Sequence, residues 1–125
     1  MKLRIALITT AALIGAAVSA SAGDQGDPEP GCNGSTYEMV DCFKAKTAQW
    51  DKRLNTAYPK ALSMAQPKQR EQLRKAQRAW VAYRDANCLY WDLGEGTIAR
   101  IQAGDCMYRM TKERAEELEG AAEGN

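Results

Sequence analysis

The chain has 125 residues, with 17 basic and 16 acidic side chains and no histidine. So balanced a charge argues against a nucleic-acid-binding protein, which needs a basic excess to neutralise phosphates. Without histidine, Ser–His and Cys–His nucleophilic pairs are excluded. Acidic residues such as Asp51 and Asp85 each have a basic residue within helical reach, which favours solvated or paired carboxylates over acid–base catalysis. We therefore expect neither an enzyme nor a cofactor.

Residues 1–22 are predicted to be a signal peptide. Lys2 and Arg4 precede an apolar run, residues 5–18, that is too short to span a membrane comfortably. Ala20-Ser21-Ala22 then offers a small-x-small cleavage site. Processing there removes both N-terminal basic residues and leaves a near-neutral chain long enough for one small domain. We expect a periplasmic or secreted protein with no membrane anchor in its mature form.

Residues 23–34 read as a flexible linker, because glycine, proline and aspartate dominate them. All four cysteines, Cys32, Cys42, Cys88 and Cys106, lie beyond the signal peptide. Export favours their oxidation, whereas a metal site would want histidine or a C-x-x-C pair, and neither is present. We predict two disulfides and favour Cys32–Cys42 with Cys88–Cys106. The two crossed connectivities stay open, because helix register alone allows them.

The first long helix is predicted from a cap at Ser35 or Thr36 to about Ala65. Ser35 followed by Glu38 has the spacing of a capping box. An apolar stripe on this helix predicts its buried face: Met39, Phe43, Trp50, Leu54, Ala57, Tyr58, Ala61 and Leu62. Pro59 is expected to kink the helix or restart it near Lys60.

A second helix is predicted from Pro67, well placed as its first residue, to about Trp91. Its core-facing stripe is expected to hold Leu73, Trp80, Cys88 and Trp91.

With so short a connection between them, the first and second helices should lie antiparallel. Counting outward from the turn pairs Asp51 with Arg84 and Asn55 with Gln77. We interpret these four residues and Trp80 as a structural clamp that fixes helix register, with a ligand site as the alternative.

The two glycines flanking Glu95 predict a loop, Asp92 to Thr97, between the second helix and a third. The third helix follows from Thr97, and Gly104-Asp105 is a candidate point of interruption within it. Residues 113–125 are expected to be an acidic, fraying end.

The domain is placed at residues 35–120, with 121–125 as a disordered tail. The fold class is all-α: an antiparallel helical hairpin with a third packed helix, stapled by two disulfides.

Several motifs resemble the LprI-like lysozyme-inhibitor family, long catalogued as a bacterial exported domain of unknown function. They span about Cys32 to Leu118 and read Thr36-x-x-Met39-x-x-Cys42, Asp51-x-x-Leu54-Asn55-x-x-Tyr58, Gln77-x-x-Trp80-x-x-Tyr83-Arg84-Asp85-x-x-Cys88, Gly96-Thr97, Cys106 and Thr111-x-x-Arg114-x-x-x-Leu118. The resemblance implies a helical, disulfide-bonded domain of the bacterial envelope. The named member is a lipoprotein, whereas this sequence lacks the lipidation cysteine.

From the resemblance we expect a lysozyme inhibitor that acts by steric occlusion of a lysozyme-type glycosidase. Such a cleft is concave and works with two carboxylates, so a blocker should insert a protrusion that carries donors. The loop supplies the candidate partner-binding residues Asp92, Glu95, Thr97 and Arg100. Thr97 and Arg100 are the expected donors, whereas Glu95 suits only the cleft rim. The alternative is a non-catalytic structural or accessory envelope module with another protein partner.

Overall fold

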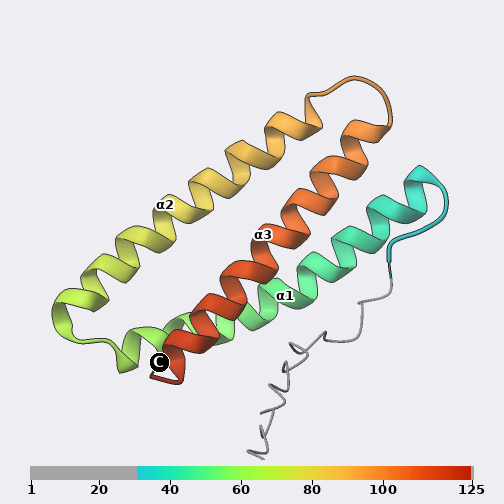
Figure 1. Cartoon of the computed structure of the whole chain (residues 1–125). Coiled ribbons are helices and arrows are strands. Elements are labelled where there is room, and N and C mark those ends of the chain that lie inside the picture. Colours follow the sequence, from blue (N-terminus) through green and yellow to red (C-terminus); the bar gives the residue numbers. More distant parts are fainter. Residues whose placement is uncertain (1–30, 125) are drawn as a thin grey trace, which may run out of the picture.

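The computed structural model describes residues 31–124, which fold into three α-helices in an up–down–up arrangement (Figure 1). The helices are α1 (Thr36–Met64), α2 (Pro67–Asp92) and α3 (Ile98–Ala122). No strand occurs among these residues, so the predicted all-α class is confirmed. No helix in this range is long and apolar enough to cross a membrane. The predicted signal peptide and residues 23–30 of the predicted linker lie outside the described residues.

Helix α1 begins at the predicted capping box. The Glu38 backbone N–H donates to Ser35 Oγ at 3.3 Å, and the Ser35 backbone N–H donates to the Glu38 carboxylate at 2.7 Å. Of the two expectations for Pro59, a kink or a restart near Lys60, the restart is wrong, because α1 continues through Pro59 to Met64. A proline removes a single backbone donor, and Ala57 and Ala61 on either side of it are buried in the core, which holds the helix together there.

The connection between α1 and α2 is only two residues long and is held by Arg70. This side chain donates from Nε to the Leu62 carbonyl at 3.0 Å and from Nη2 to the Ala65 carbonyl at 3.1 Å. The last carbonyls of a helix have no intrahelical partner, and a guanidinium both satisfies them and complements the negative end of the helix dipole. Arg70 therefore closes the end of α1 from the first turn of α2.

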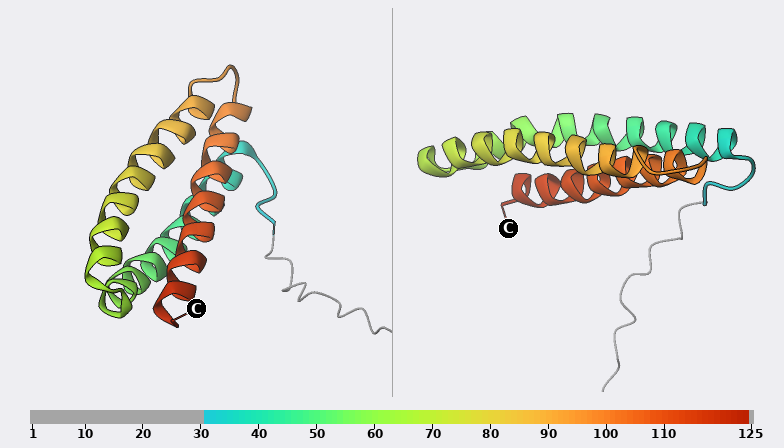
Figure 2. Two further views of the ribbon diagram at one scale, coloured as in Figure 1. Left: turned by 60° about the vertical axis from the view of Figure 1, so that its left-hand side comes forward. Right: turned by 90° about the horizontal axis from the view of Figure 1, so that it is seen from above.

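The core lies chiefly between α1 and α3. It contains Trp50, Leu54, Ala57 and Ala61 from α1 with Ala115 and Leu118 from α3, and Leu73 and Trp80 of α2 pack at its edge. Sequence neighbours α1 and α2 are antiparallel, yet they touch at few points, whereas α1 packs mostly against α3 (Figures 1 and 2). The third helix is thus the centre of the bundle. The first two helices form the expected antiparallel hairpin, but each packs mainly against α3 and not against the other.

Gly104 lies inside α3 and does not interrupt it. A Cβ at this position would lie 3.1 Å from the Phe43 Cβ, which is tighter than ordinary packing. Phe43 also contacts Tyr108, one turn beyond Gly104, with 6.1 Å between the ring centroids. The glycine is therefore needed for the close approach of α3 to α1, which outweighs its low helix propensity.

The acidic end of the chain is packed, contrary to the expectation of a fraying segment. Within residues 113–122, Ala115 and Leu118 are 0% and 1% exposed. On the outside of the same segment, Arg53 of α1 donates from Nε and Nη2 to the two Glu119 carboxylate oxygens at 2.8 and 2.7 Å. Net acidity alone predicted a solvated tail, but the apolar positions at helical spacing decide where this segment lies.

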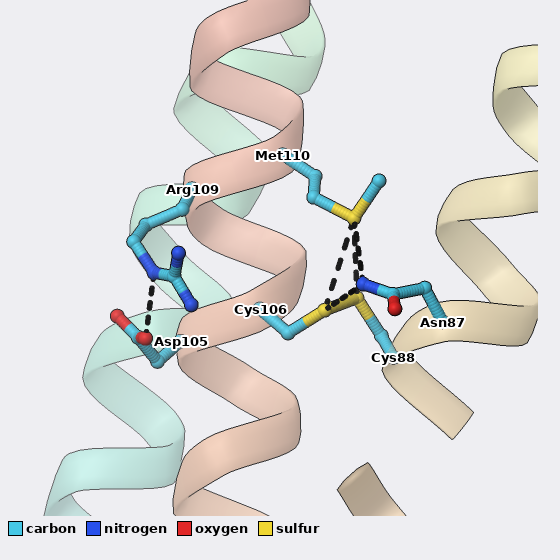
Figure 3. A network of polar contacts seen from close by, with 6 residues as sticks. All are labelled: Asn87, Cys88, Asp105, Cys106, Arg109 and Met110. Carbon is cyan, nitrogen blue, oxygen red and sulfur yellow. Dashed lines mark hydrogen bonds and ion pairs between the residues drawn. A yellow bond between two sulfur atoms is a disulfide. The ribbon is translucent and has the colours of Figure 1, made fainter. Parts of the chain in front are cut away.

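Both predicted disulfides are present. Cys32–Cys42 ties the segment before α1 to its second turn, and Cys88–Cys106 joins α2 to α3. Beside the second bridge, Asn87 donates to Met110 Sδ and Cys106 Sγ, each at 3.4 Å (Figure 3). These contacts fix the last turns of α2 against the first half of α3.

Gln77 is buried, as expected, but its partner is different. Its Oε1 accepts a hydrogen bond from Arg114 Nε of α3 at 2.9 Å, and Arg114 also pairs with Glu117. The predicted partner, Asn55, donates instead to Asp51 Oδ2 on its own helix at 3.1 Å. Counting outward from the turn assumed that α1 and α2 stay in contact, whereas α3 packs between them and supplies the partner.

Replacing Arg114 with Met should destabilise the protein by about 1–3 kcal/mol, because the buried Gln77 amide then loses its partner. Adding Gln77→Leu to that variant should recover part of the loss, since both polar groups are then gone. Urea unfolding followed by circular dichroism measures both. Arg109→Met is the matched control on the same helix, because its side chain is 59% exposed. If the two single changes simply add, Gln77 and Arg114 are not coupled.

The Arg53–Glu119 pair should make stability depend on pH. The hydrogen bond from Arg53, helped by its charge, lowers the pKa of the Glu119 carboxyl below its ordinary 4.5. A carboxyl with a depressed folded pKa contributes stability that is present above the unfolded pKa and is lost as pH falls through the folded pKa. Denaturation midpoints of the parent and Glu119→Gln should therefore differ most near neutral pH and converge in acid.

The control for this pH dependence is Glu116→Gln, which removes an exposed carboxylate from the same helix. Its midpoints should follow those of the parent over the whole pH range. A constant gap between the parent and Glu119→Gln would show that the glutamine acts through packing and not through the ion pair.

Candidate functional site

The divergence of α1 and α2 leaves a groove at one end of the bundle. Its volume is about 780 Å³, and all three helices line it. The lining residues are Val40, Lys44, Thr47, Ala48 and Asp51 of α1, Arg84, Asp85, Cys88, Leu89 and Asp92 of α2, and Arg100, Ala103, Gly104 and Met107 of α3. The groove therefore follows directly from the packing of α3 against α1, which holds α2 away from α1.

The groove carries balanced charge beside apolar surface. Lys44, Arg84 and Arg100 are matched by three acidic residues, and Val40, Leu89 and Met107 contribute apolar atoms. Two residues predicted as partner-binding from the loop, Asp92 and Arg100, are among the lining residues. Such a surface suits a partner segment of mixed polarity better than a purely apolar or strongly charged ligand.

Arg84 is the more enclosed partner of an ion pair that lines the groove. Its side chain is 15% exposed, it forms an ion pair with Asp85 at 2.8 Å, and its guanidinium lies 4.9 Å from the centroid of the Trp80 ring. A guanidinium stacked on an indole face and paired with a carboxylate keeps its charge while its stem is covered. Arg84 is thus held in a fixed position at the edge of the groove.

The predicted clamp is only partly assembled. Asp51 and Arg84 line the same groove, as expected, but within residues 31–124 no hydrogen bond or ion pair joins them. Arg84 pairs with Asp85, and Asp51 accepts from Asn55. The pairing of Asp51 with Arg84 is therefore wrong. The reason is the same as for Gln77 and Asn55: α3 separates the two helices on which the register count relied.

The predicted loop lies at the end of the molecule, between α2 and α3 (Figure 1). We call residues 92–97 the tip. Gly96 adopts a φ of +74°, a left-handed conformation that favours glycine, and Thr97 makes no side-chain cap to α3 although it occupies the cap position. Glu95 and Thr97 are exposed, and Arg100 follows one turn into α3. The tip therefore presents the predicted residues to solvent.

Large apolar side chains surround the tip, a feature that the sequence reasoning missed. The exposed ones are Leu89, Tyr90, Trp91, Leu93 and Ile98, which we call the apolar collar. Trp91 was expected to face the core, but it is 39% exposed and packs edge-on against Tyr90. The signal was present in the run Leu89-Tyr90-Trp91-Asp92-Leu93, in which consecutive apolar residues cannot all face one side of a helix.

The arrangement offers contacts for recognition. Among residues 31–124, no group of three or more His, Cys, Asp or Glu side chains is placed to hold a metal ion. All four cysteines are in disulfides. The site presents an exposed apolar collar, a groove of mixed charge and a glycine-containing tip. In the tip, the Thr97 side chain makes no capping hydrogen bond to α3. Exposed apolar surface of this kind, rimmed by polar residues, is typical of protein–protein contacts.

Comparison with known proteins identifies the family. The family model for "Lysozyme inhibitor LprI" matches residues 30–118, which is most of the chain. An uncharacterized protein of Rhizobium meliloti (strain 1021) is 31% identical over 85 residues, covering 66% of this chain and 55% of that relative. The chain thus spans little more than half the length of that relative. No solved structure matches the chain. The extent of the family match establishes that the chain belongs to the LprI lysozyme inhibitor family.

Proposed function

We propose that this protein inhibits a lysozyme-type glycosidase by seating its tip in the mouth of the enzyme's cleft. The observation that carries the proposal is the apolar collar. Tyr90, Leu93 and Ile98 are 70%, 76% and 54% exposed, and five of the nine large apolar residues that are exposed within residues 31–124 lie in residues 89–98, at or beside the tip. Aromatic and aliphatic side chains at the centre of a contact contribute most of the binding energy when a partner covers them.

The polar groups at the tip suit a cleft with two carboxylates. The Thr97 hydroxyl, the guanidinium of Arg100 and the first amides of α3 are all donors, and the N-terminal end of a helix carries partial positive charge. Asp92 and Glu95 are acidic, so we place them at the rim of the cleft, away from its carboxylates. In this arrangement the collar provides affinity and the donors provide orientation.

We also propose that the protein acts in the periplasm or outside the cell. Both disulfides join cysteines that an oxidising compartment would link, and residues 1–22 have the composition of a signal peptide. A lysozyme acting on the cell wall is met in that compartment. The family to which the chain belongs is an inhibitor family, which supports lysozyme as the partner.

Inhibition should depend on Ile98. Ile98→Asp places a carboxylate beside the acids of the cleft and removes apolar contact, so about tenfold or more of the protein should be needed for half-inhibition. Aspartate at the first position of a helix is favourable, so α3 should stay folded. The measurement is lysis of cell walls by lysozyme in the presence of the purified protein without residues 1–22.

The matched control is Met64→Asp, which makes the same kind of change at a residue that is 59% exposed. Met64 is the last residue of α1, at the end of the bundle far from the tip (Figure 1). This variant should inhibit as well as the parent. Deletion of residues 94–96 with helicity unchanged should abolish inhibition. Full inhibition by Ile98→Asp and by the deletion would place the contact elsewhere, with the groove as the next surface to test. No inhibition by the intact protein would favour the accessory envelope module instead.

A further inference from the structure

A second apolar stripe runs along α2 and its C-cap residue, Leu93, on the side away from the core of the bundle. It consists of Ala76, Ala79, Tyr83, Ala86, Tyr90 and Leu93, which we call the outer seam. All six residues are exposed, and the three large ones are 62%, 70% and 76% exposed. The buried residues of α2, Gln77 and Cys88, lie on a different face. A helix of a monomer needs one apolar face, whereas α2 has two.

The spacing of the outer seam is that of a coiled coil. Successive members are three, four, three, four and three residues apart, which is the alternation that keeps a stripe facing one partner helix. In Figures 1 and 2, α2 lies at the edge of the bundle, and α3 packs against its inner side. Within the part of the chain that the structure describes, the outer seam is therefore open to a partner.

The order of large and small residues selects that partner. If a second α2 lies antiparallel, with the two-fold axis between Arg84 and Asp85, then Ala76 faces Leu93, Ala79 faces Tyr90 and Tyr83 faces Ala86. Every large side chain then meets an alanine, and each layer has the pairing expected of an antiparallel coiled coil. A parallel pair in register would instead place tyrosine on tyrosine. We propose that the outer seam binds a second copy of this chain as an antiparallel homodimer.

The charges along α2 favour the same orientation. Residues 67–78 contain five basic side chains and one acidic one, whereas residues 79–95 contain one basic and three acidic ones. Antiparallel pairing sets the basic half of one helix beside the acidic half of the other. Parallel pairing would set like charges side by side, which opposes association. Shape and charge thus select one geometry, and a two-fold axis closes it into a dimer.

The dimer goes beyond the inhibition proposed above and does not require it. Its two tips lie at opposite ends of the paired helices. Tyr90 and Leu93 belong to both the apolar collar and the outer seam, so the dimer covers part of the collar, whereas Ile98 and Thr97 belong to neither the outer seam nor its layers. Association is measured without any enzyme, so failure of either proposal is distinguishable from failure of the other.

The test is sedimentation equilibrium of the purified protein without residues 1–22, at low micromolar to millimolar concentration. We expect a reversible monomer–dimer equilibrium. Ala86→Tyr would oppose two tyrosines in the central layer, and it should raise the dissociation constant about tenfold or more. Exchanging the two residues, with Tyr83→Ala and Ala86→Tyr together, restores a large–small layer and should recover the dimer.

Ala45→Tyr is the matched control, because it makes the same change at an exposed alanine of α1 away from the outer seam. It should leave the equilibrium unchanged. A parent protein that stays monomeric throughout the range would overturn the proposal. Dimerisation that Ala86→Tyr does not weaken would overturn it as well.

Orientation is tested separately with a spin label on Lys68→Cys. In the antiparallel dimer the two labelled positions lie about 50 Å apart along the paired helices, at roughly 1.5 Å of rise per residue. In a parallel dimer they would lie on the order of 10 Å apart, the distance between packed helix axes. The long distance is the expected result, and the short one would exclude the antiparallel geometry.

Discussion

The close approach of α1 to α3 is the contact on which the remaining architecture depends. It requires small residues where the two backbones come nearest: Gly104 against Phe43 at one end, and Ala57, Ala61 and Ala115 in the core. Larger side chains at these positions would force the helices apart, because a packed interior has no free volume to absorb them. With α1 committed to α3, α2 is left to contact the pair mainly through α3, and the groove is the space that results.

Sequence reasoning predicted the elements well because their signals are local. Ser35 with Glu38 defines the start of α1, Pro67 the start of α2, and Gly94 and Gly96 the loop before α3. The favoured disulfide pairing is also confirmed, although helix register alone had left the crossed connectivities open. The helix starts and the loop are each determined by a few neighbouring residues. Local rules of this kind depend little on how the helices later pack.

The partners of the polar side chains were not predictable in the same way. Gln77 and Arg84 were correctly seen to need partners, but the register count chose Asn55 and Asp51, whereas the structure gives Arg114 and Asp85. The count used the two helices joined by the shortest connection, and a short connection fixes proximity only at the turn. The helix at the centre of the bundle is the one whose small residues allow the closest approach of neighbouring backbones. That can be judged only when all three helices are considered together. The exposure of Trp91 was missed for a different reason, because the run of consecutive apolar residues 89–91 already indicated that they cannot all face the core.

The two ends of the bundle are held together by different means. Where the core is densest, around Leu54, Ala61 and Leu118, apolar packing joins α1 to α3. At the groove end α2 stands away from α1, and there the two disulfides Cys32–Cys42 and Cys88–Cys106 are found, with Cys88 itself in the groove wall. Covalent bonds tolerate an open space beside them, which a hydrophobic core does not. The width of the groove and the position of the tip therefore depend on the two disulfides staying oxidised. The stability of the far end depends instead on keeping its apolar side chains out of water.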